Sequence, residues 1–554
     1  MNEDCLTLNV FMPQNAKPGD DLAVMIFIHG GGFVSGSGAD YDGSLLAATT
    51  NVIVVTFNYR LGPLGFMNFH DPVLCGNYGL KDQIEAIKWV KENVASFGGD
   101  MNRITVFGSG DGARATRYLA GSKANKHMMI KRVILQSEPF HYPLSTDEHR
   151  KHVVAAGDLL GCTWNKSATI PTQAKDLLGC FKGKPAKTIA DITNAPSFQP
   201  AEDDYDFLLP SLMIDLRDPA SMSAKRFGSV DVIVGSNSNE YASKSLVSAF
   251  LNDIGASNGL SDAQFMATVT QTMAKIMGSR EFSKIEAVQL IKNLYNSDEP
   301  TERLKKVVSM MTDKLFTSQA SILTDLHNSL PGNGNTFQYV FDYRGAKSAA
   351  IDWATNGAAC GDELLYLFGS NDKNDNDMMR TMMKYWSNFA KSGNPNSPHN
   401  VPQWDATTAE QPKYLLIGAT GDMVDGIPRK TYVKTWSKLM GHDLSMSGEM
   451  KMQRHDCRKS SISRLIWIRA DEAEAILIGL SVALAVFIII AVLLAMFLSS
   501  ARKKLRLTSE RYQLLSKHKP AVEDDDFAAT TGAYNFQNAT LDMTENQDNT
   551  LTHF

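Results

Sequence analysis

The sequence predicts an α/β fold, in which helices cover both faces of a mostly parallel sheet. Residues 23–28 and 52–57 are continuous apolar runs, which are typical of strands buried on both faces. Residues 79–97 place apolar side chains at helical spacing. Residues 103–113 then read as a short strand, a glycine turn and the start of a helix. Strands that alternate with helices in this way favour parallel pairing.

Two shorter segments complete the predicted sheet. Residues 6–11 alternate apolar and polar side chains, which is the period of a strand. Residues 133–136 form another short apolar run after the predicted helix.

Composition narrows the classes of function. The chain has 554 residues and a net charge of -5, so it lacks the clustered basic character of a nucleic-acid-binding protein. Its length exceeds the roughly 250–300 residues at which single cores usually stop growing. Six cysteines are too few for a disulfide scaffold in so long a chain.

Residues 475–498 form a run without a charged residue, long enough to span about 30 Å of hydrocarbon as a helix. Acidic residues precede the run and four basic residues follow it, which predicts a type I plasma-membrane protein with a cytosolic C-terminus. We expect an ectodomain over 1–440, a stalk over 441–474, the transmembrane helix over 475–498 and a disordered tail over 499–554. Residues 1–30 contain no leader for export, so we expect the N-terminus to be truncated.

An extracellular ectodomain changes the interpretation of several residues. Cys162 and Cys180 flank a short segment, and they are either two free buried thiols or, as we predict in an oxidising compartment, a disulfide. Asn165 begins a glycosylation sequon, Asn-Lys-Ser.

The glycine turn is the most informative motif. Strand, turn and helix are the setting of the pentapeptide G-x-S-x-G, whose serine is the nucleophile of many hydrolases. Here the pentapeptide runs from Gly108 to Gly112, and its central residue is Gly110. Gly31 and Gly32, together with the amide of Asp111, are the expected donors of an oxyanion hole. A carboxylate on Asp111 opposes the stabilisation that such a hole provides, although it also suits a helix N-terminus.

Motifs from residue 3 to about residue 440 resemble the type-B carboxylesterase/cholinesterase family, which has the α/β-hydrolase fold. They include Glu-Asp-Cys-Leu-Thr-Leu-Asn-Val at 3–10, His-Gly-Gly-Gly-Phe at 29–33 and Gly-Asn-Tyr-Gly-Leu-Lys-Asp-Gln at 76–83. Others are Asn-Tyr-Arg-Leu-Gly-Pro-Leu-Gly-Phe at 58–66, Gly-Asp-Glu-Leu-Leu-Tyr-Leu-Phe-Gly at 361–369 and the segment 385–395. In the family, the cysteine that matches Cys5 pairs with a region missing here.

The resemblance implies where a catalytic triad would lie. The nucleophile position is Gly110, the acid position is Glu240 and the histidine position is Cys360. Two of the three groups are therefore replaced, and we expect no esterase activity, no cofactor and no metal. Ser109 lies one residue from the apex of the turn, so we expect its hydroxyl to point elsewhere. The alternative, an esterase that uses a non-standard nucleophile such as Cys360, needs a neighbouring base or cation that the sequence does not supply.

The chain is similar to a membrane-anchored, non-catalytic branch of the family, typified by neuroligin and gliotactin. This resemblance implies cell adhesion or junction and synapse organisation, with a neurexin-like partner and calcium. A carrier of hydrophobic ligands stays open as a third alternative.

Family members dimerise through a bundle of four helices, so we expect a homodimer here. We assign its interface to apolar positions of two predicted helices, Met378, Met382, Trp386, Tyr432 and Trp436, although both helices could simply pack on the sheet. The C-terminus, with Thr552 and Phe554, matches the pattern that PDZ scaffold domains bind by strand addition.

Overall fold

The computed structural model describes residues 3–441, except 126–128, 142–143, 193–197, 202–217, 257–258, 278–280, 370–371 and 399–400. The predicted stalk, transmembrane helix and tail, with Thr552 and Phe554, lie outside the described residues and stay predictions. Within the described part, no helix has the length and apolar character to cross a membrane.

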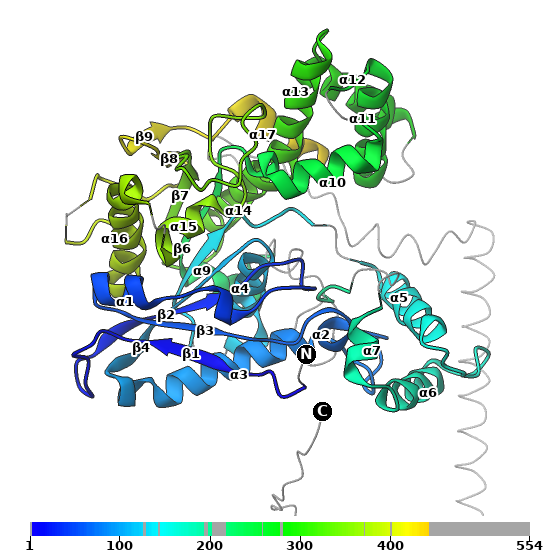
Figure 1. The fold of residues 1–554 in the computed structure, drawn as a ribbon, viewed down its shortest axis with the longest axis horizontal. Coiled ribbons are helices and arrows are strands. Elements are labelled where there is room, and N and C mark those ends of the chain that lie inside the picture. The colour runs from blue at the N-terminus through cyan, green and yellow to red at the C-terminus, as the bar shows by residue number, and fades with distance from the viewer. Residues whose placement is uncertain are drawn as a thin grey trace, which may run out of the picture. The chain divides into compact units, whose positions relative to one another are not determined.

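The described residues build one mixed sheet of nine strands, whose order is β1-β3-β2-β4-β5-β6-β7-β8-β9 (Figure 1). All neighbours from β3 to β8 pair in parallel, and β1 and β9 join the two edges antiparallel. The sheet confirms the predicted α/β class. The strands are β1 Leu8–Phe11, β2 Leu22–Ile28, β3 Ile53–Phe57, β4 Gly99–Ser109, β5 Arg132–Gln136, β6 Asp231–Asn237, β7 Thr336–Phe341, β8 Lys413–Ile417 and β9 Asp422–Asp425.

Strand β2 shows why a continuous apolar run predicted burial on both faces. Val24 and Ile26 belong to one hydrophobic cluster, whereas Met25 and Phe27 belong to the cluster on the opposite face. All four side chains are buried. Each such side chain contributes about 1.5–3 kcal/mol of hydrophobic stabilisation.

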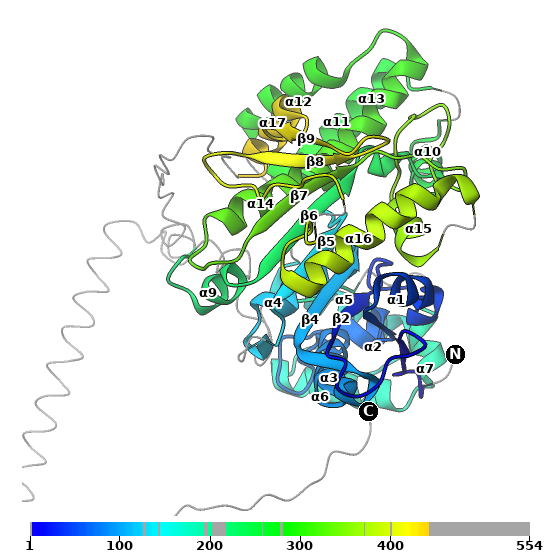
Figure 2. The ribbon, with the colours of Figure 1, turned by 90° about the vertical axis from the view of Figure 1, so that its left-hand side faces the viewer.

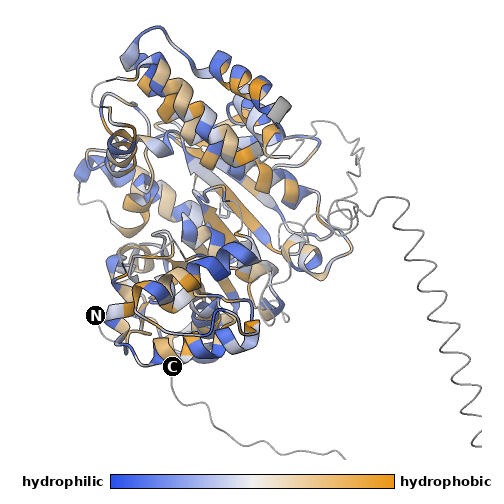
Figure 3. Ribbon diagram, turned by 90° about the vertical axis from the view of Figure 1, so that its right-hand side faces the viewer, coloured by the Kyte–Doolittle hydropathy of each residue, from blue (hydrophilic) through white to orange (hydrophobic). Residues whose placement is uncertain are grey.

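Helices cover both faces of the sheet. On one face, α3 (Tyr78–Asn93), α4 (Asp111–Gly121) and α14 (Ser318–Asn328) supply residues to the first cluster. On the other face, α1 (Ser44–Thr50), α15 (Asp362–Phe368) and α16 (Asn376–Ser392) supply the second. Figure 2 shows α16 crossing in front of the strands, and Figure 3 shows apolar colours concentrated on the central strands.

A third hydrophobic cluster holds the helical region at the top of Figure 1. It joins α10 (Lys244–Ile254), α11 (Asp262–Met277), α12 (Glu281–Tyr295), α13 (Pro300–Thr312) and α17 (Lys430–Leu439). The remaining helices are α2 (Gly62–Phe66), α5 (Thr146–Leu159), α6 (Ile170–Lys182), α7 (Ala186–Ala190) and α9 (Met222–Gly228).

The predicted disulfide between Cys162 and Cys180 is present, with a Cα–Cα distance of 5.8 Å. It ties the end of α5 to α6. Asn165 lies exposed in the loop that this disulfide closes.

Most of the residues assigned to a dimer interface are buried in the single chain. Met378, Met382, Trp386 and Trp436 are buried within the single chain, and only Tyr432 is partly exposed. Helix α16 packs on β2 and β4 and against helices α1 and α15, so much of its apolar surface is used inside the protomer. The interface assignment of these residues stays a prediction, as does homodimerisation itself.

Candidate functional site

The turn between β4 and α4 has the geometry of a nucleophile elbow. Gly110 has φ 60° and ψ -124°, a conformation that side chains other than glycine rarely adopt. Its amide donates to the carbonyl of Gln136 at the end of β5, at 2.9 Å. A Cβ atom added at Gly110 would meet no atom within 4 Å, so the apex of the turn faces open space.

The outer glycines of the pentapeptide serve close packing. A Cβ atom on Gly112 would lie 2.0 Å from the carbonyl oxygen of Ile28, and one on Gly108 would lie 2.4 Å from the backbone of Gly112. Helix α4 therefore approaches β2 more closely than a side chain allows. Gly30, which follows β2, is packed as tightly against the carbonyl of Ser109, so the glycine loop of the predicted oxyanion hole lies beside the elbow.

Ser109 points away from the apex, as predicted. Its hydroxyl donates to Glu363 Oε1 at 3.3 Å, beneath the turn. Gln136 Nε2 donates to the same oxygen at 3.3 Å, and Asn237 Nδ2 donates to Glu363 Oε2 at 2.6 Å. Glu363 thus connects the ends of β4, β5 and β6.

Glu240 and Cys360 are neighbours in the structure although 120 positions separate them in the sequence. The amide of Cys360 donates to the carbonyl oxygen of Glu240 at 3.2 Å. The Glu240 side chain accepts from the amide of Asn237 at 2.7 Å. The side chain of Asn237 donates to the carbonyl of Ala359 at 2.6 Å, so Asn237 joins the segments that carry the two positions, one through its backbone amide and the other through its side chain.

Burial disfavours the negatively charged forms of three side chains in this cluster, Glu240, Glu363 and Cys360. Burial, followed by the nearby charge of Glu363, raises the pKa of Glu240. Burial also raises the pKa of Glu363. Both carboxyl groups are fully buried, and neither forms an ion pair within the described residues. Burial and the charges of both glutamates raise the pKa of the Cys360 thiol well above its usual range, which opposes formation of a nucleophilic thiolate.

Asp111 is paired rather than isolated. Its carboxylate accepts from Arg114 at 2.6 Å, one turn along α4, and Arg114 also lies over the ring of Phe33 at 4.8 Å. Both charged side chains are largely buried. The pairing compensates part of the negative charge that the sequence placed beside the oxyanion hole.

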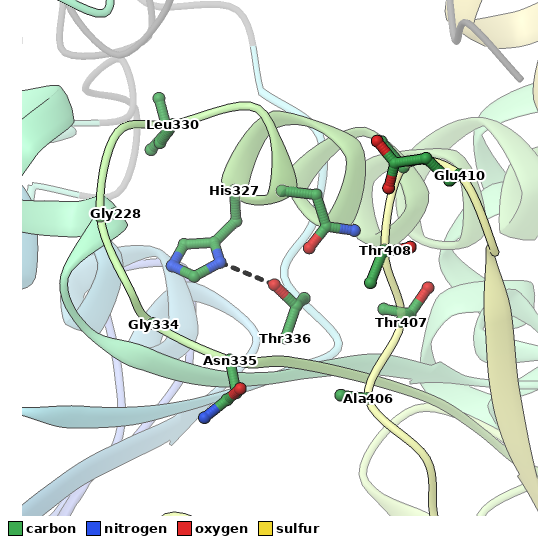
Figure 4. A pocket seen from close by; sticks show the side chains of 13 residues that line it. Gly228, His327, Leu330, Gly334, Asn335, Thr336, Ala406, Thr407, Thr408 and Glu410 are labelled. Atoms are coloured by element: carbon green, nitrogen blue, oxygen red, sulfur yellow. Dashed lines mark hydrogen bonds between the residues drawn. The ribbon is translucent and has the colours of Figure 1, made fainter. Parts of the chain in front are cut away.

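Two buried histidines, His29 and His327, have structural contacts. His29 is buried, stacks on Tyr59 at 4.4 Å and shares a hydrogen bond with the carbonyl of Gly30. His327 hydrogen bonds to Thr336 at 2.7 Å beside a cavity of about 290 Å³ (Figure 4). Thr336 is the first residue of β7, whereas the elbow follows the last residue of β4, which runs parallel to it. His327 therefore lies at the amino ends of the parallel strands, and the elbow lies at their carboxyl ends.

The sequence analysis missed Asn237, Gln136, Glu363 and Arg114 as parts of the site. Glu363 belongs to the Gly-Asp-Glu-Leu motif that was recognised but given no role. Arg114 follows Asp111 by three residues on a helix, and that spacing is the signal that could have identified the pair.

Comparisons with known proteins agree with this architecture. The sequence profile of the Carboxylesterase family matches residues 1–436. The chain is 31% identical to Neuroligin-3 of Mus musculus over 498 residues, which cover 80% of the chain and 57% of that protein. It is 30% identical to Neuroligin-2 of Homo sapiens, covering 80% of the chain and 56% of that protein.

A protein named as an enzyme also matches. Bile salt-activated lipase of Rattus norvegicus is 32% identical over 470 residues, which cover 78% of the chain and 73% of the lipase. The chain thus spans little more than half the length of the neuroligins it matches, and about three quarters of the lipase. Since the family profile covers most of the described fold, the chain belongs to the carboxylesterase family.

Proposed function

We propose that the chain is a non-catalytic, cholinesterase-like cell-surface receptor that acts in cell adhesion or in the organisation of junctions or synapses. The observation that carries the proposal is Gly110. It occupies the apex of the elbow in nucleophile geometry, with open space before it and no side chain to attack a carbonyl. The similarity to neuroligins supports the same function.

The surroundings of Cys360 support the loss of catalysis independently. A triad needs a base that accepts the proton of the nucleophile. At the histidine position the chain has a thiol, and the buried carboxyl groups beside it raise the pKa of that thiol. A group that holds its proton so tightly serves poorly either as a base or as a nucleophile.

The remaining features of the proposal rest on the sequence. Residues 475–498 anchor the ectodomain in the plasma membrane as a type I protein, and Asn165 carries a glycan. The C-terminal Thr552 and Phe554 bind a cytosolic PDZ scaffold. The extracellular partner is neurexin-like and binds with calcium, as the resemblance to neuroligins implies, and the receptor acts as a homodimer.

The alternative function is a membrane-bound carboxylesterase with a non-standard nucleophile. The similarity to bile salt-activated lipase favours it, because that relative matches at comparable identity. The two functions differ in whether the chain hydrolyses acyl esters, and in whether such hydrolysis requires a side chain such as Cys360.

A pair of measurements separates the two functions. First, the full chain, displayed on cells behind an added signal peptide, is exposed to a fluorophosphonate probe, and a family esterase with an intact serine serves as the positive control. We expect no labelling of the chain. Secondly, cells that display the full chain are mixed with cells that display a neurexin ectodomain, with and without calcium, and we expect calcium-dependent aggregation.

Labelling of the chain, or ester hydrolysis that the variant Cys360→Ala abolishes, would contradict the non-catalytic proposal. Cells that fail to aggregate with neurexin-displaying cells would reject that partner. A pull-down of surface proteins with the full chain then tests adhesion itself, and recovery of no cell-surface protein would count against the receptor function.

A further inference from the structure

We propose that Cys75 and Lys81 are a redox-sensitive pair that forms a covalent sulfur–nitrogen bond when a peroxide oxidises the thiol. Lys81 Nζ lies 3.2 Å from Cys75 Sγ. This pair lies outside the elbow cluster, and the proposal does not depend on the function proposed above.

The backbone between the two residues holds them together. Gly76 and Asn77 have φ values of 75° and 55°, so two successive residues in the left-handed region turn the chain back on itself. Helix α3 begins directly afterwards at Tyr78. Cys75 therefore folds back onto the first turn of α3, where Lys81 projects.

The turn is anchored from a distant part of the chain. Asn77 is fully buried, and its side chain exchanges two hydrogen bonds with the backbone of Ala201, at 2.8 and 2.9 Å. A Cβ atom on Gly76 would lie 2.6 Å from the side chain of Asn68, so the loop is closely packed on its other side as well. The contact between sulfur and amine is thus part of a fixed turn.

The ammonium group of Lys81 is the positively charged group in contact with the sulfur atom among the described residues. Lys81 Nζ also lies 5.6 Å from the ring of Tyr78, and the guanidinium of Arg60, which is paired with Asp82 at 2.7 Å, lies over the same ring at 5.4 Å. Burial, followed by the charge of Cys75, raises the pKa of Tyr78 to about 12, so the phenol remains protonated beside the sulfur. Cationic, partly exposed surroundings are those in which cysteines react with oxidants.

The two other free cysteines of the described residues serve as comparisons. Cys360 faces Glu240 and Glu363, which raise the pKa of its thiol. Cys5 is partly buried, and no lysine amine within the described residues is in hydrogen-bond contact with its sulfur. Cys75 is also partly exposed, so a small peroxide can reach it.

The reaction has two steps. The sulfur of Cys75 attacks one oxygen of hydrogen peroxide, an S–O bond forms, the O–O bond breaks, and the products are a sulfenic acid and water. The ammonium group of Lys81 releases one proton to solvent, and the resulting neutral amine attacks the sulfur. An S–N bond forms, and the S–O bond breaks as the hydroxyl group leaves with a second proton of the amine as a second water. Sulfur is oxidised by two electrons, peroxide is reduced, and the protein loses two hydrogen atoms. Proximity favours the second step, because the two atoms are already in contact.

Peptide mapping of the purified full chain tests the proposal. After treatment with hydrogen peroxide and alkylation of free thiols, the chain is digested with trypsin, which cleaves after unmodified lysine and arginine. We expect cleavage at Lys81 to be lost, so that one peptide spans residues 61–88 with a mass two hydrogen atoms below the reduced form. A thiol reductant should restore cleavage.

Two variants control the experiment. Lys81→Arg keeps the positive charge but removes the amine, so we expect no cross-link and increased sulfinic acid at Cys75. Lys88→Arg is the matched control, since Lys88 lies on the same helix and pairs with Glu85, and the cross-link should form as in the unmodified sequence.

Three outcomes would overturn the proposal. The first is sulfinic acid at Cys75 with cleavage at Lys81 intact. The second is a disulfide between Cys75 and Cys5. The third is a linked peptide that has gained one oxygen atom, which would indicate an S–O–N bridge instead of the direct bond.

Discussion

The variant Gly110→Ser tests whether the fold accepts a serine at the apex of the elbow and whether that serine reacts. The structure predicts a small effect of Gly110→Ser on folding, because the new side chain meets no atom within 4 Å. What remains is the strain of φ 60° with ψ -124°, a sparsely populated backbone region that costs a residue other than glycine about 1–3 kcal/mol. Gly112→Ala is the contrasting variant: its Cβ atom would lie 2.0 Å from the carbonyl oxygen of Ile28, and we expect it to prevent folding or to lower stability far more.

The same serine should be chemically inert alone. Loss of triad members lowers kcat by roughly 10⁴–10⁶ in a serine hydrolase, and Gly110→Ser still lacks the histidine that activates it. Adding Cys360→His places an imidazole next to Glu240, whose backbone already contacts residue 360. We therefore expect fluorophosphonate labelling only in the double variant, at a rate below that of an intact esterase because Asp111 remains at the predicted oxyanion hole.

The assay compares labelling and thermal unfolding of the single, double and Gly112→Ala variants. Rapid labelling of Gly110→Ser alone would refute the reasoning, since it would mean that another side chain already acts as the base. A melting temperature for Gly110→Ser as low as that of Gly112→Ala would refute the claim that a side chain at position 110 meets no neighbouring atom.

Three further predictions concern stability. Burial raises the pKa of Glu240 from 4.5 to about 8, so between these pH values the folded chain keeps a proton that the unfolded chain releases. The free energy of unfolding should therefore fall as pH rises through this range. The variant Glu240→Gln should weaken this pH dependence, as measured by urea unfolding at several pH values. Arg117→Met leaves Glu138 buried without its ion-pair partner, which lies at 2.8 Å, and should cost about 3–5 kcal/mol in the same assay. Cys162→Ser opens a disulfide loop with a sequence separation of 18 to Cys180 and should cost about 3 kcal/mol, an effect that a reductant should reproduce in the parent protein.

Much of the sheet could be predicted from the sequence because its strands are buried on both faces. Residues 52–57 became β3, Ile53–Phe57, and residues 133–136 became β5, Arg132–Gln136. Residues 79–97 became α3, Tyr78–Asn93, followed by a short 3-10 turn. Continuous apolar runs and helical periodicity are local signals, so one sequence is enough to read them.

Helix α16 shows where local signals fail. Its methionines and Trp386 cover more than one face, which the sequence analysis attributed to an interface between two copies. A helix that is apolar on several faces is also the pattern of a helix buried inside a large fold. The contacts with β2, β4, α1 and α15 show that α16 packs inside the fold, and such contacts between distant segments are not encoded in the periodicity of the helix itself.

At the elbow, the fold and ester hydrolysis depend on different positions of the pentapeptide. Gly108 and Gly112 are needed where backbone meets backbone, so the turn depends on them whether or not the chain is an enzyme. Position 110 carries no packing demand, since its apex faces open space, and a chain can change it without rebuilding the turn. The carboxyl groups of Glu240 and Glu363 differ again: each is fully buried, and the charge of Glu363 disfavours ionisation of Glu240. If Glu240→Gln proves more stable than the parent at neutral pH, that carboxyl group is retained at the expense of stability, and its hydrogen bond to Asn237 cannot be the reason the chain keeps it.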